Sequence, residues 1–167
     1  VLRSACRAAA AWPAGVSVAV NLSPAQFRRG DLVKTVAAAL EESGLLASRL
    51  ELEVTEGLLL QDSDTVFETL TALRRMGVSI AMDDFGTGYS SLAYLKALHL
   101  DYLKIDSGLT RDITAAPRDR IIVRGIIAMA KSLSLSVVAE GVENETQLSL
   151  LAREGCDIYQ DRKSTRL

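Results

Sequence analysis

Apolar and polar positions follow two alternating patterns along the chain. Short apolar runs rich in β-branched residues are typical of buried strands, and the longer segments between them have apolar residues at helical spacing. We expect strands at Val16–Leu22, Leu50–Glu56, Val78–Phe85, Tyr102–Asp106, Ser136–Val142 and Cys156–Gln160. We expect helices at Leu2–Trp12, from Pro24 or Asp31 to Ser43, and at Ser63–Met76, Ser90–Leu98, Arg118–Leu133 and Glu145–Glu154.

Several of the expected helix ends carry capping chemistry. Ser23 begins the sequence Ser-Pro-Ala-Gln, which orders a capping hydroxyl, a proline at the first helical position and a glutamine that closes a capping box. Gly44, Gly77 and Gly155 each follow an expected helix, where a left-handed residue is favoured. These signals mark helix boundaries independently of the apolar pattern.

The alternation of strands and helices predicts a parallel sheet covered by helices, either doubly wound or closed into a barrel. A complete (β/α)₈ barrel takes about 250 residues. The chain has 167 residues, so its six expected strands fit an incomplete TIM-type (β/α) barrel. The sequence contains no linker-like or low-complexity stretch, which indicates a single domain.

The composition narrows the class of protein. Hydrophobic residues make up 49% and charged residues 24% of the chain, as in ordinary globular domains. The net charge of -2 provides no basic field for a nucleic acid polymer, so an anionic ligand needs a metal or a placed cation. Cys6 and Cys156 form no motif, which favours a reducing compartment, and we expect the cytoplasm. No apolar run reaches the roughly 18 residues of a membrane span, while a tether elsewhere in a parent protein stays open.

Unusual polar residues stand at or near the ends of the expected strands. They are Asn21, Glu53 and Glu56, Asp83 and Asp84, Lys104, Glu140 and Glu143, and Gln160. In a parallel barrel the carboxyl ends of all strands meet on one face, which carries the active site. Strand alternation turns Glu53 and Lys104 away from their apolar neighbours, which should face the helices. Both side chains are therefore expected to point into the barrel.

Single residues of this set also have structural interpretations. An acidic residue after a strand is often a helix N-cap. Ser23 and Thr87 are expected to be structural, and Asp106 fits a cap and a site residue equally well. Glu51 is expected to be solvated or paired, and His99, the single histidine, to be structural. Polar residues at the ends of successive strands nevertheless favour a shared site.

Several carboxylates around one axis would repel one another, and a divalent cation would offset that repulsion. Oxygen ligands without cysteine or histidine nearby suit Mg²⁺ or Mn²⁺ rather than zinc. The adjacent Asp83 and Asp84 would allow one carboxylate to bridge two ions, an arrangement that recurs in phosphodiester cleavage. After this pair, Gly86 and Gly88 predict a mobile or tightly turned loop beside the site.

The same residues carry a resemblance to a known family. The motifs are Asn21-Leu22-Ser23, Glu53-Val54-Thr55-Glu56, the block Asp-Asp-Phe-Gly-Thr-Gly-Tyr-Ser-Ser over residues 83–91, Lys104-Ile105-Asp106, Glu140-Gly141-Val142-Glu143 and Tyr159-Gln160. In order and spacing they resemble the EAL domain family from residue 1 to about residue 160, and the block over residues 83–91 is highly specific. The resemblance implies a bacterial phosphodiesterase that linearises cyclic di-GMP to 5′-pGpG.

The resemblance also implies roles for single residues. Lys104 resembles the lysine that contacts the attacking water and the phosphate, and Glu140 resembles a metal ligand or a carboxylate that orients the water. Both are therefore expected to take part in catalysis. The ligands of two Mg²⁺ or Mn²⁺ ions would be Asn21, Glu53, Asp83, Asp84 and Glu140.

Further roles concern the substrate and the glycine loop. Glu143 and Gln160 resemble residues that bind cyclic di-GMP, and Glu56 resembles the glutamate that anchors the loop of Gly86 and Gly88. Members of the family often dimerise near this loop and follow sensory or nucleotide-cyclase-like domains. A homodimer and such domains in the parent chain are therefore implied as partners.

Two departures from the family pattern bear on the ends of the chain. The Glu-Ala-Leu motif of the family's first strand, whose glutamate is a metal ligand, is absent. Residues 161–167 are polar and basic, unlike a terminal barrel helix. We therefore expect a partial EAL domain over residues 1–160, without the first strands and the terminal helix, followed by an atypical tail. The parent protein would be the phosphodiesterase, and the fragment alone is expected to be inactive or poorly folded, because an open barrel exposes strand edges.

Two other functions stay open on the sequence. An EAL-like domain that has lost ligands can serve as a cyclic-di-GMP receptor or an interaction module, although every ligand motif visible in the chain is intact. A different barrel hydrolase, or an enolising lyase with Mg²⁺ and a lysine base, also uses carboxylates on successive strands. The block over residues 83–91 argues against this second alternative.

Overall fold

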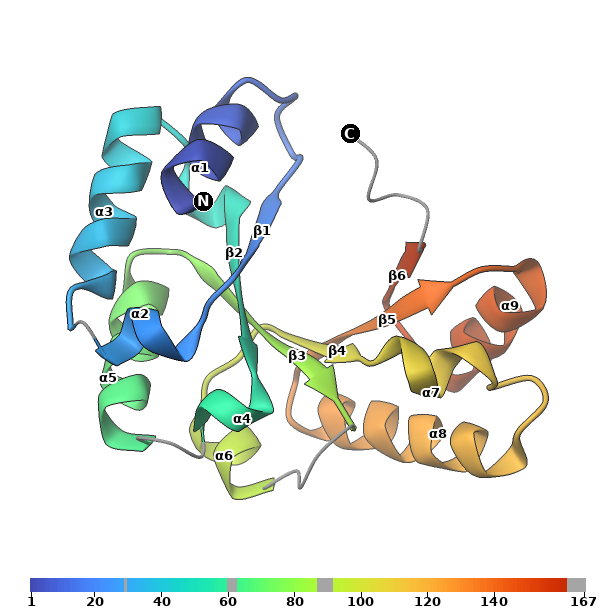
Figure 1. Cartoon of the computed structure of the whole chain (residues 1–167). Coiled ribbons are helices and arrows are strands. Elements are labelled where there is room, and N and C mark those ends of the chain that lie inside the picture. Colours follow the sequence, from blue (N-terminus) through green and yellow to red (C-terminus); the bar gives the residue numbers. More distant parts are fainter. Residues whose placement is uncertain (29, 60–62, 87–91, 162–167) are drawn as a thin grey trace. The chain divides into compact units, whose positions relative to one another are not determined.

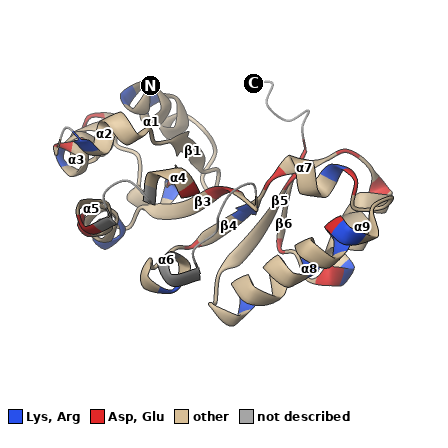
Figure 2. Cartoon of the chain, turned by 60° about the horizontal axis from the view of Figure 1, so that its bottom comes forward, with Lys and Arg blue, Asp and Glu red and all other residues tan. Residues whose placement is uncertain are grey.

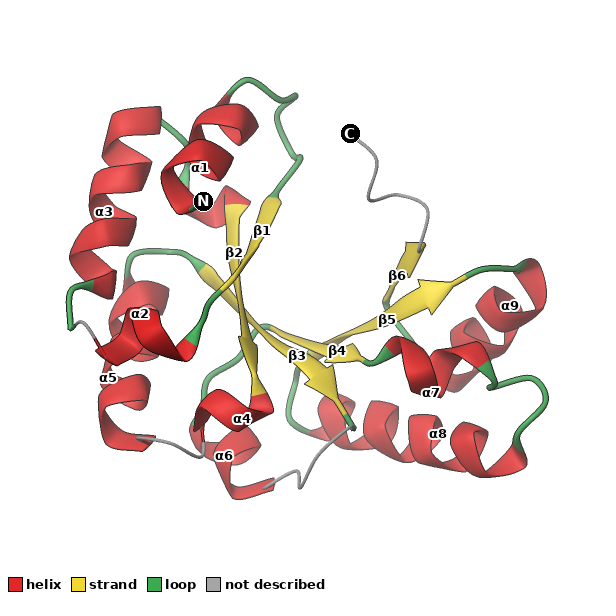
Figure 3. Ribbon diagram, viewed as in Figure 1, coloured by secondary structure: helices red, strands yellow, loops and turns green. Residues whose placement is uncertain are grey.

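The computed structural model describes residues 1–28, 30–59, 63–86 and 92–161, and strands and helices alternate through them (Figures 1 and 3). The strands are β1 (Val18–Asn21), β2 (Leu50–Thr55), β3 (Ser79–Phe85), β4 (Tyr102–Ile105), β5 (Ser136–Val142) and β6 (Ile158–Asp161). The α-helices are α1 (Leu2–Ala10), α2 (Pro24–Arg28), α3 (Leu32–Ser43), α4 (Glu56–Leu59), α5 (Ser63–Arg75), α6 (Leu92–Ala97), α7 (Ser107–Arg111), α8 (Pro117–Ser132) and α9 (Glu145–Glu154), and the short 3₁₀-helix η1 spans Ala47–Arg49.

The strands follow one another in chain order, β1-β2-β3-β4-β5-β6. The chain divides into two compact units, one of Val1–Ala81 with Ala93–Leu100 and one of Met82–Leu92 with Asp101–Leu167. Strand β3 begins in the first unit and ends in the second. Each unit has its own buried core.

In the first unit, β1 and β2 pair in parallel, and the register sets Val18 beside Leu50. Helices α1 and α3 pack against each other, and α1 also contacts β1. The core is apolar, with Leu50, Leu52 and Val54 fully buried along β2. Burial of such side chains stabilises the unit by roughly 1.5–3 kcal/mol each.

In the second unit, β4, β5 and β6 pair in parallel, which the alternation of strands and helices predicts. Helix α7 packs on β5 and on α8, and α9 contacts β5. Charges of both signs are interspersed on α8 and α9 (Figure 2), where Arg120 lies 3.1 Å from a carboxylate oxygen of Glu154. No helix among the described residues combines the length and apolar character needed to cross a membrane.

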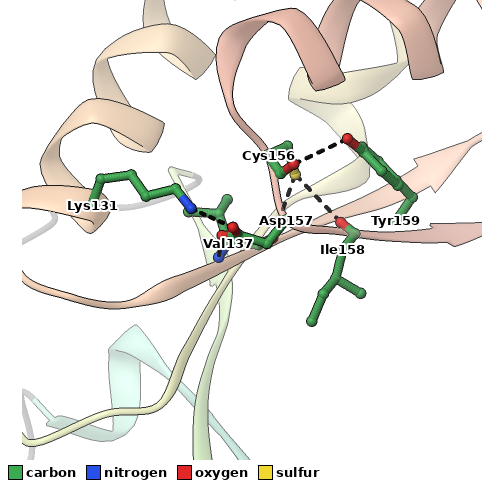
Figure 4. Close-up of polar contacts among 6 residues, drawn as sticks. All are labelled: Lys131, Val137, Cys156, Asp157, Ile158 and Tyr159. Atoms are coloured by element: carbon green, nitrogen blue, oxygen red, sulfur yellow. Dashed lines mark hydrogen bonds and ion pairs between the residues drawn. The ribbon is translucent and has the colours of Figure 1, made fainter.

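Asp157, directly before β6, connects β5 and α8 through a hydrogen bond and an ion pair (Figure 4). One of its carboxylate oxygens accepts a hydrogen bond from the backbone N–H of Val137 at 2.8 Å, and the other pairs with the ammonium of Lys131. The backbone N–H of Asp157 in turn donates to the carbonyl of Val137 at 3.2 Å. The hydrogen bond from Lys131 is the largest cause that lowers the pKa of Asp157, followed by the bond from Val137.

Several expected elements agree with the structure. Strand β5 and helix α9 have the expected bounds, and the glycine caps at Gly44, Gly77 and Gly155 all adopt a left-handed φ. At Ser23 the backbone N–H donates to Oε1 of Gln26 at 2.9 Å, which is one of the two hydrogen bonds of a capping box, and the Ser23 hydroxyl donates to the same oxygen at 3.0 Å. At these positions the residues near each boundary were sufficient to predict where the element begins or ends.

Other boundaries were right only in part. Of the two starts expected for the helix that ends at Ser43, Asp31 is confirmed, since it directly precedes α3, whereas Pro24 begins the separate helix α2. The last strand starts at Ile158 rather than Cys156, whose backbone N–H closes α9 by donating to Leu151. The short helices α4 and α7 were not expected at all, since single turns have too few residues to show a helical period.

Candidate metal centre and substrate cavity

Asn21 and Glu53 lie side by side at the ends of β1 and β2 in the first unit. They are register partners, and the backbone N–H of Leu22 donates to the carbonyl of Glu53 at 2.8 Å. Glu53 is only 6% exposed, whereas Asn21 is exposed. A carboxylate this buried needs partners or a cation, which makes Glu53 a candidate site residue.

Asp83 and Asp84 lie near the end of β3, in the part of the strand that belongs to the second unit. The backbone N–H of Asp84 donates to Oδ1 of Asp83 at 3.0 Å. Asp84 has a left-handed φ of 55°, a conformation that costs a residue with a Cβ about 1–2 kcal/mol. In a regular strand neighbouring side chains point to opposite faces, and this φ interrupts that alternation at the end of β3. Such outliers cluster at functional sites.

Glu140 of β5 joins this pair. Asp83, Asp84 and Glu140 each offer one carboxylate oxygen, and these oxygens lie within 4.8 Å of one another. Lys104 of β4 is 4% exposed, and its Nζ lies 2.6 Å from Oε1 of Glu140 and 3.5 Å from Oδ1 of Asp83. The three carboxylates and Lys104 are hereafter called the carboxylate cluster.

The electrostatics of the cluster favour a further cation. Burial is the largest cause that raises the pKa of Asp84, and the negative charges of Asp83 and Asp106 raise it further, while Lys104 acts in the opposite direction. Two or more carboxylates beside one ammonium leave an excess of negative charge. Carboxylate oxygens without cysteine or histidine in the set suit a hard divalent cation such as Mg²⁺ or Mn²⁺. The residues present therefore fit the metal that the sequence predicts.

A cavity of about 180 Å³ opens beside Glu140 in the same unit. Glu143 and Gln160, both expected to bind substrate, line it together with Ser107 and Arg111 of α7. Arg111 is the residue that sequence reasoning missed. It follows the Lys104-Ile105-Asp106 motif by a few residues, but the short helix that turns it toward the cavity gives no periodic signal.

Two glycines let α7 pack closely against its neighbours. Gly141 of β5 has a φ of 69°, and a Cβ built there would lie 2.7 Å from Cβ of Ser107. Gly86, after the aspartate pair, has a φ of 100°, and a Cβ there would lie 2.6 Å from Cδ1 of Leu109. Both glycines therefore have backbone conformations that only glycine adopts without strain.

Other expected residues have different outcomes. Asp106, which fitted two roles, caps α7, since its side chain accepts a hydrogen bond from Gly108 at 2.8 Å. Glu56 begins α4 in the first unit, so its role as a loop anchor stays a prediction. Thr87 and Gly88 lie outside the described residues.

Known proteins supply an independent comparison. The family model of the EAL domain matches residues 1–160 of the chain. The chain belongs to the EAL domain family. The cyclic di-GMP phosphodiesterase NbdA of Pseudomonas aeruginosa is 49% identical over 164 residues, which is 96% of this chain and 21% of that protein. The chain spans about a fifth of the length of the curated relatives it matches.

Solved structures of EAL proteins have the same fold. The structure of the PaMucR phosphodiesterase in complex with c-di-GMP has a TM-score of 0.92 and 44% identity, over 99% of this chain and 68% of that one. The manganese/cy-diGMP complex of Klebsiella pneumoniae BlrP1 at pH 9.0 has a TM-score of 0.88 and 33% identity, over 96% of this EAL chain and 41% of that one. A calcium/cy-diGMP complex of BlrP1 matches similarly, with a TM-score of 0.86. The expected α/β class, an incomplete TIM-type barrel of EAL type, is thereby confirmed.

Proposed function

We propose that this EAL domain hydrolyses cyclic di-GMP to linear 5′-pGpG, with two divalent cations activating the attacking water. The observation that carries the proposal is the carboxylate cluster, in which Asp83, Asp84 and Glu140 converge around the buried Lys104. It is supported by relatives that are named cyclic di-GMP phosphodiesterases. The reaction breaks the P–O3′ bond and leaves a 5′-phosphate and a 3′-hydroxyl.

The cations are proposed to be Mg²⁺ or Mn²⁺, held by oxygens of Asp83, Asp84 and Glu140. Their motifs extend the same role to Asn21 and Glu53. The complexes of BlrP1 with manganese or calcium and cy-diGMP support a divalent cation at this site. When bound, the cations supply Lewis-acid activation of the water and offset charge that develops on the phosphate.

The side chains of the second unit have distinct tasks in this proposal. Lys104 is held at the cluster by Glu140 and Asp83, so its N–H groups are preorganised to donate to a phosphate oxygen as charge develops there. Glu140 orients the attacking water with its carboxylate. Glu143 and Gln160, beside it on the cavity, orient the substrate. Placing these groups on adjacent strands keeps them in register before the substrate binds.

The test is turnover of cyclic di-GMP by the parent protein with Mg²⁺ or Mn²⁺, followed by separation of pGpG from substrate. Glu53→Ala should lower kcat by about 100-fold or more, because a ligand carboxylate is lost. Glu41→Ala, which removes an exposed carboxylate from α3, is the matched control and should not change kcat. Tight binding of cyclic di-GMP by the wild-type protein without turnover would instead place it among cyclic-di-GMP receptors.

We also propose that the parent carries further domains and acts in the cytoplasm. One relative, MucR of Pseudomonas aeruginosa, is a bifunctional diguanylate cyclase and cyclic di-GMP phosphodiesterase and is 45% identical over 164 residues. Cys6 and Cys156 are both free thiols, as is usual in a reducing compartment. A homodimer near the glycine loop remains part of the proposal, and light scattering of the parent protein would test it.

A further inference from the structure

The cavity beside Glu140 combines acidic groups with one guanidinium. Glu140, Glu143 and Asp161 line it with carboxylates, Gln160 adds an amide, and Arg111 adds a positive charge. A carboxylate accepts hydrogen bonds and repels phosphate, whereas a guanidinium donates in a planar fork. The lining therefore offers both acceptors and donors to a ligand with both kinds of group.

A buried side chain holds Arg111 and Glu143 in a fixed relation. Gln147 of α9 is 3% exposed. Its Nε2 donates to the carbonyl of Arg111 at 2.9 Å, and its Oε1 accepts from the backbone N–H of Glu143 at 2.8 Å. One amide thus joins the backbones of two residues that line the cavity, and a buried amide satisfied at both ends is costly to displace.

Helix α7 is also held against β5, by a hydrogen bond and by close packing. The hydroxyl of Thr110 donates to the carbonyl of Glu140, and Thr110 is fully buried. Gly141 allows Ser107 to approach β5 more closely than any side chain would permit. Arg111 therefore extends from a wall that is fixed to β5 and α9, and little backbone movement is needed when a ligand enters.

We propose that Arg111 recognises a guanine base of the substrate by donating two N–H groups to its O6 and N7 atoms. The fork of a guanidinium matches these two acceptors, which is the commonest specific contact between arginine and guanine. The carboxylates of the cavity then accept from the donors on the neighbouring N1–H and N2–H edge. Adenine presents an N–H₂ donor where guanine has O6, so it would oppose the guanidinium. This inference rests on the proposed function, since it assigns a specificity residue for cyclic di-GMP.

A contact of Arg111 with a substrate phosphate is the competing assignment. The acidic lining opposes it, because the carboxylates of Glu143 and Asp161 would repel the phosphate that Arg111 attracts. The strength of a phosphate contact would also not depend on which base the ligand carries, whereas a contact with O6 and N7 depends on both acceptors. The two assignments therefore differ in how they respond to removal of N7 from the ligand.

The experiment compares cyclic di-GMP with its 7-deaza analogue, which lacks the N7 acceptor, in the parent protein with Ca²⁺ for binding and Mn²⁺ for turnover. Arg111→Ala should weaken binding of cyclic di-GMP and raise its KM by about 5- to 30-fold with kcat unchanged, as for loss of uniform binding. The same substitution should change binding of the analogue far less. Arg111→Lys should lose most of the discrimination, because a single ammonium cannot bridge two acceptors. Arg118→Ala, which removes an exposed guanidinium from α8, should change neither ligand.

Each outcome decides the assignment. Equal weakening of both ligands by Arg111→Ala would show a phosphate contact and overturn it. Unchanged binding and KM in Arg111→Ala, with a wild-type protein that cleaves cyclic di-GMP, would overturn the assignment alone. A wild-type protein that neither binds nor cleaves cyclic di-GMP would overturn the proposed function, and the role of Arg111 with it. Circular dichroism of the Arg111 variants confirms that an altered affinity does not come from unfolding.

Discussion

Nζ of Lys104 lies 2.6 Å from Oε1 of Glu140 and 3.5 Å from Oδ1 of Asp83. An ammonium that is only 4% exposed is tolerated because these carboxylates surround it. The same two carboxylates, with Asp84, form the set of oxygens that suits a divalent cation. Lys104 and a bound metal would therefore share the carboxylates of Asp83 and Glu140. Replacing Lys104 and replacing one of these carboxylates should have distinct effects.

Replacing Lys104 with methionine should separate catalysis from metal binding. We expect kcat for cyclic di-GMP to fall by about 100-fold or more, because the donor aimed at the developing charge is lost. Binding of Mn²⁺ should persist or tighten, since a competing cation has left the cluster. Steady-state kinetics and calorimetric Mn²⁺ titration measure the two effects. Lys131→Met, at a lysine that pairs with Asp157 instead, should leave kcat unchanged, and loss of Mn²⁺ binding in Lys104→Met would contradict the prediction.

Replacing Asp83 with asparagine should remove the stabilisation that a metal provides. A ligand that binds only the folded state at about 100 times its Kd stabilises it by about 2.7 kcal/mol. Saturating Mn²⁺ should therefore raise the melting temperature of the wild-type protein, and chelation with EDTA should reverse the rise. In Asp83→Asn the rise should be much smaller. Asp112→Asn changes an exposed carboxylate at the end of α7 and should respond like the wild type.

Two glycine substitutions should change the free energy of unfolding in opposite directions. Gly141→Ala forces a left-handed φ of 69° on a residue with a Cβ and brings that atom 2.7 Å from Ser107. We expect the free energy of unfolding to fall by about 2 kcal/mol or more, from backbone strain of about 1–2 kcal/mol and the close contact. Gly125→Ala lies in the interior of α8 with open space around its Cβ, and should stabilise by about 0.5–1 kcal/mol. Urea denaturation measures both, and equal effects would argue against the close packing of α7 on β5.

Asp157 should make the stability of the folded protein depend on pH in the acidic range. Its pKa is lowered below the ordinary 3.8, first by the hydrogen bond from Lys131 and then by that from Val137. A carboxylate with a lowered folded pKa contributes stability above its unfolded pKa and loses it as the pH falls through the folded value. Asp157→Asn should therefore be less stable than the wild type at pH 7, and the difference should shrink below about pH 4. Thermal melts over this pH range test the prediction, and Lys131→Met should reproduce only part of the effect. A difference that grows in acid would have the wrong sign.

The sequence by itself determined the alternation of elements and most of the cluster. Strand β5 was predicted with its bounds because the short apolar run over residues 137–139 is typical of a buried strand. Asp83, Lys104 and Glu140 were predicted to share a site because parallel strands bring their carboxyl ends to one edge, whatever lies between them in the chain. Capping residues such as Gly155 act on their nearest neighbours, so they too were readable from local sequence.

The tertiary structure alone decided what depends on contacts between distant segments. Arg111 reaches the cavity because Gln147, far along the chain, holds its carbonyl, and no periodic pattern reports such a bond. The left-handed φ of Asp84 and the close approach of Ser107 to Gly141 also arise from packing rather than from propensity. Sequence patterns report the average environment of a position along an element, whereas a hydrogen bond or a strained torsion depends on which atoms other elements bring within reach.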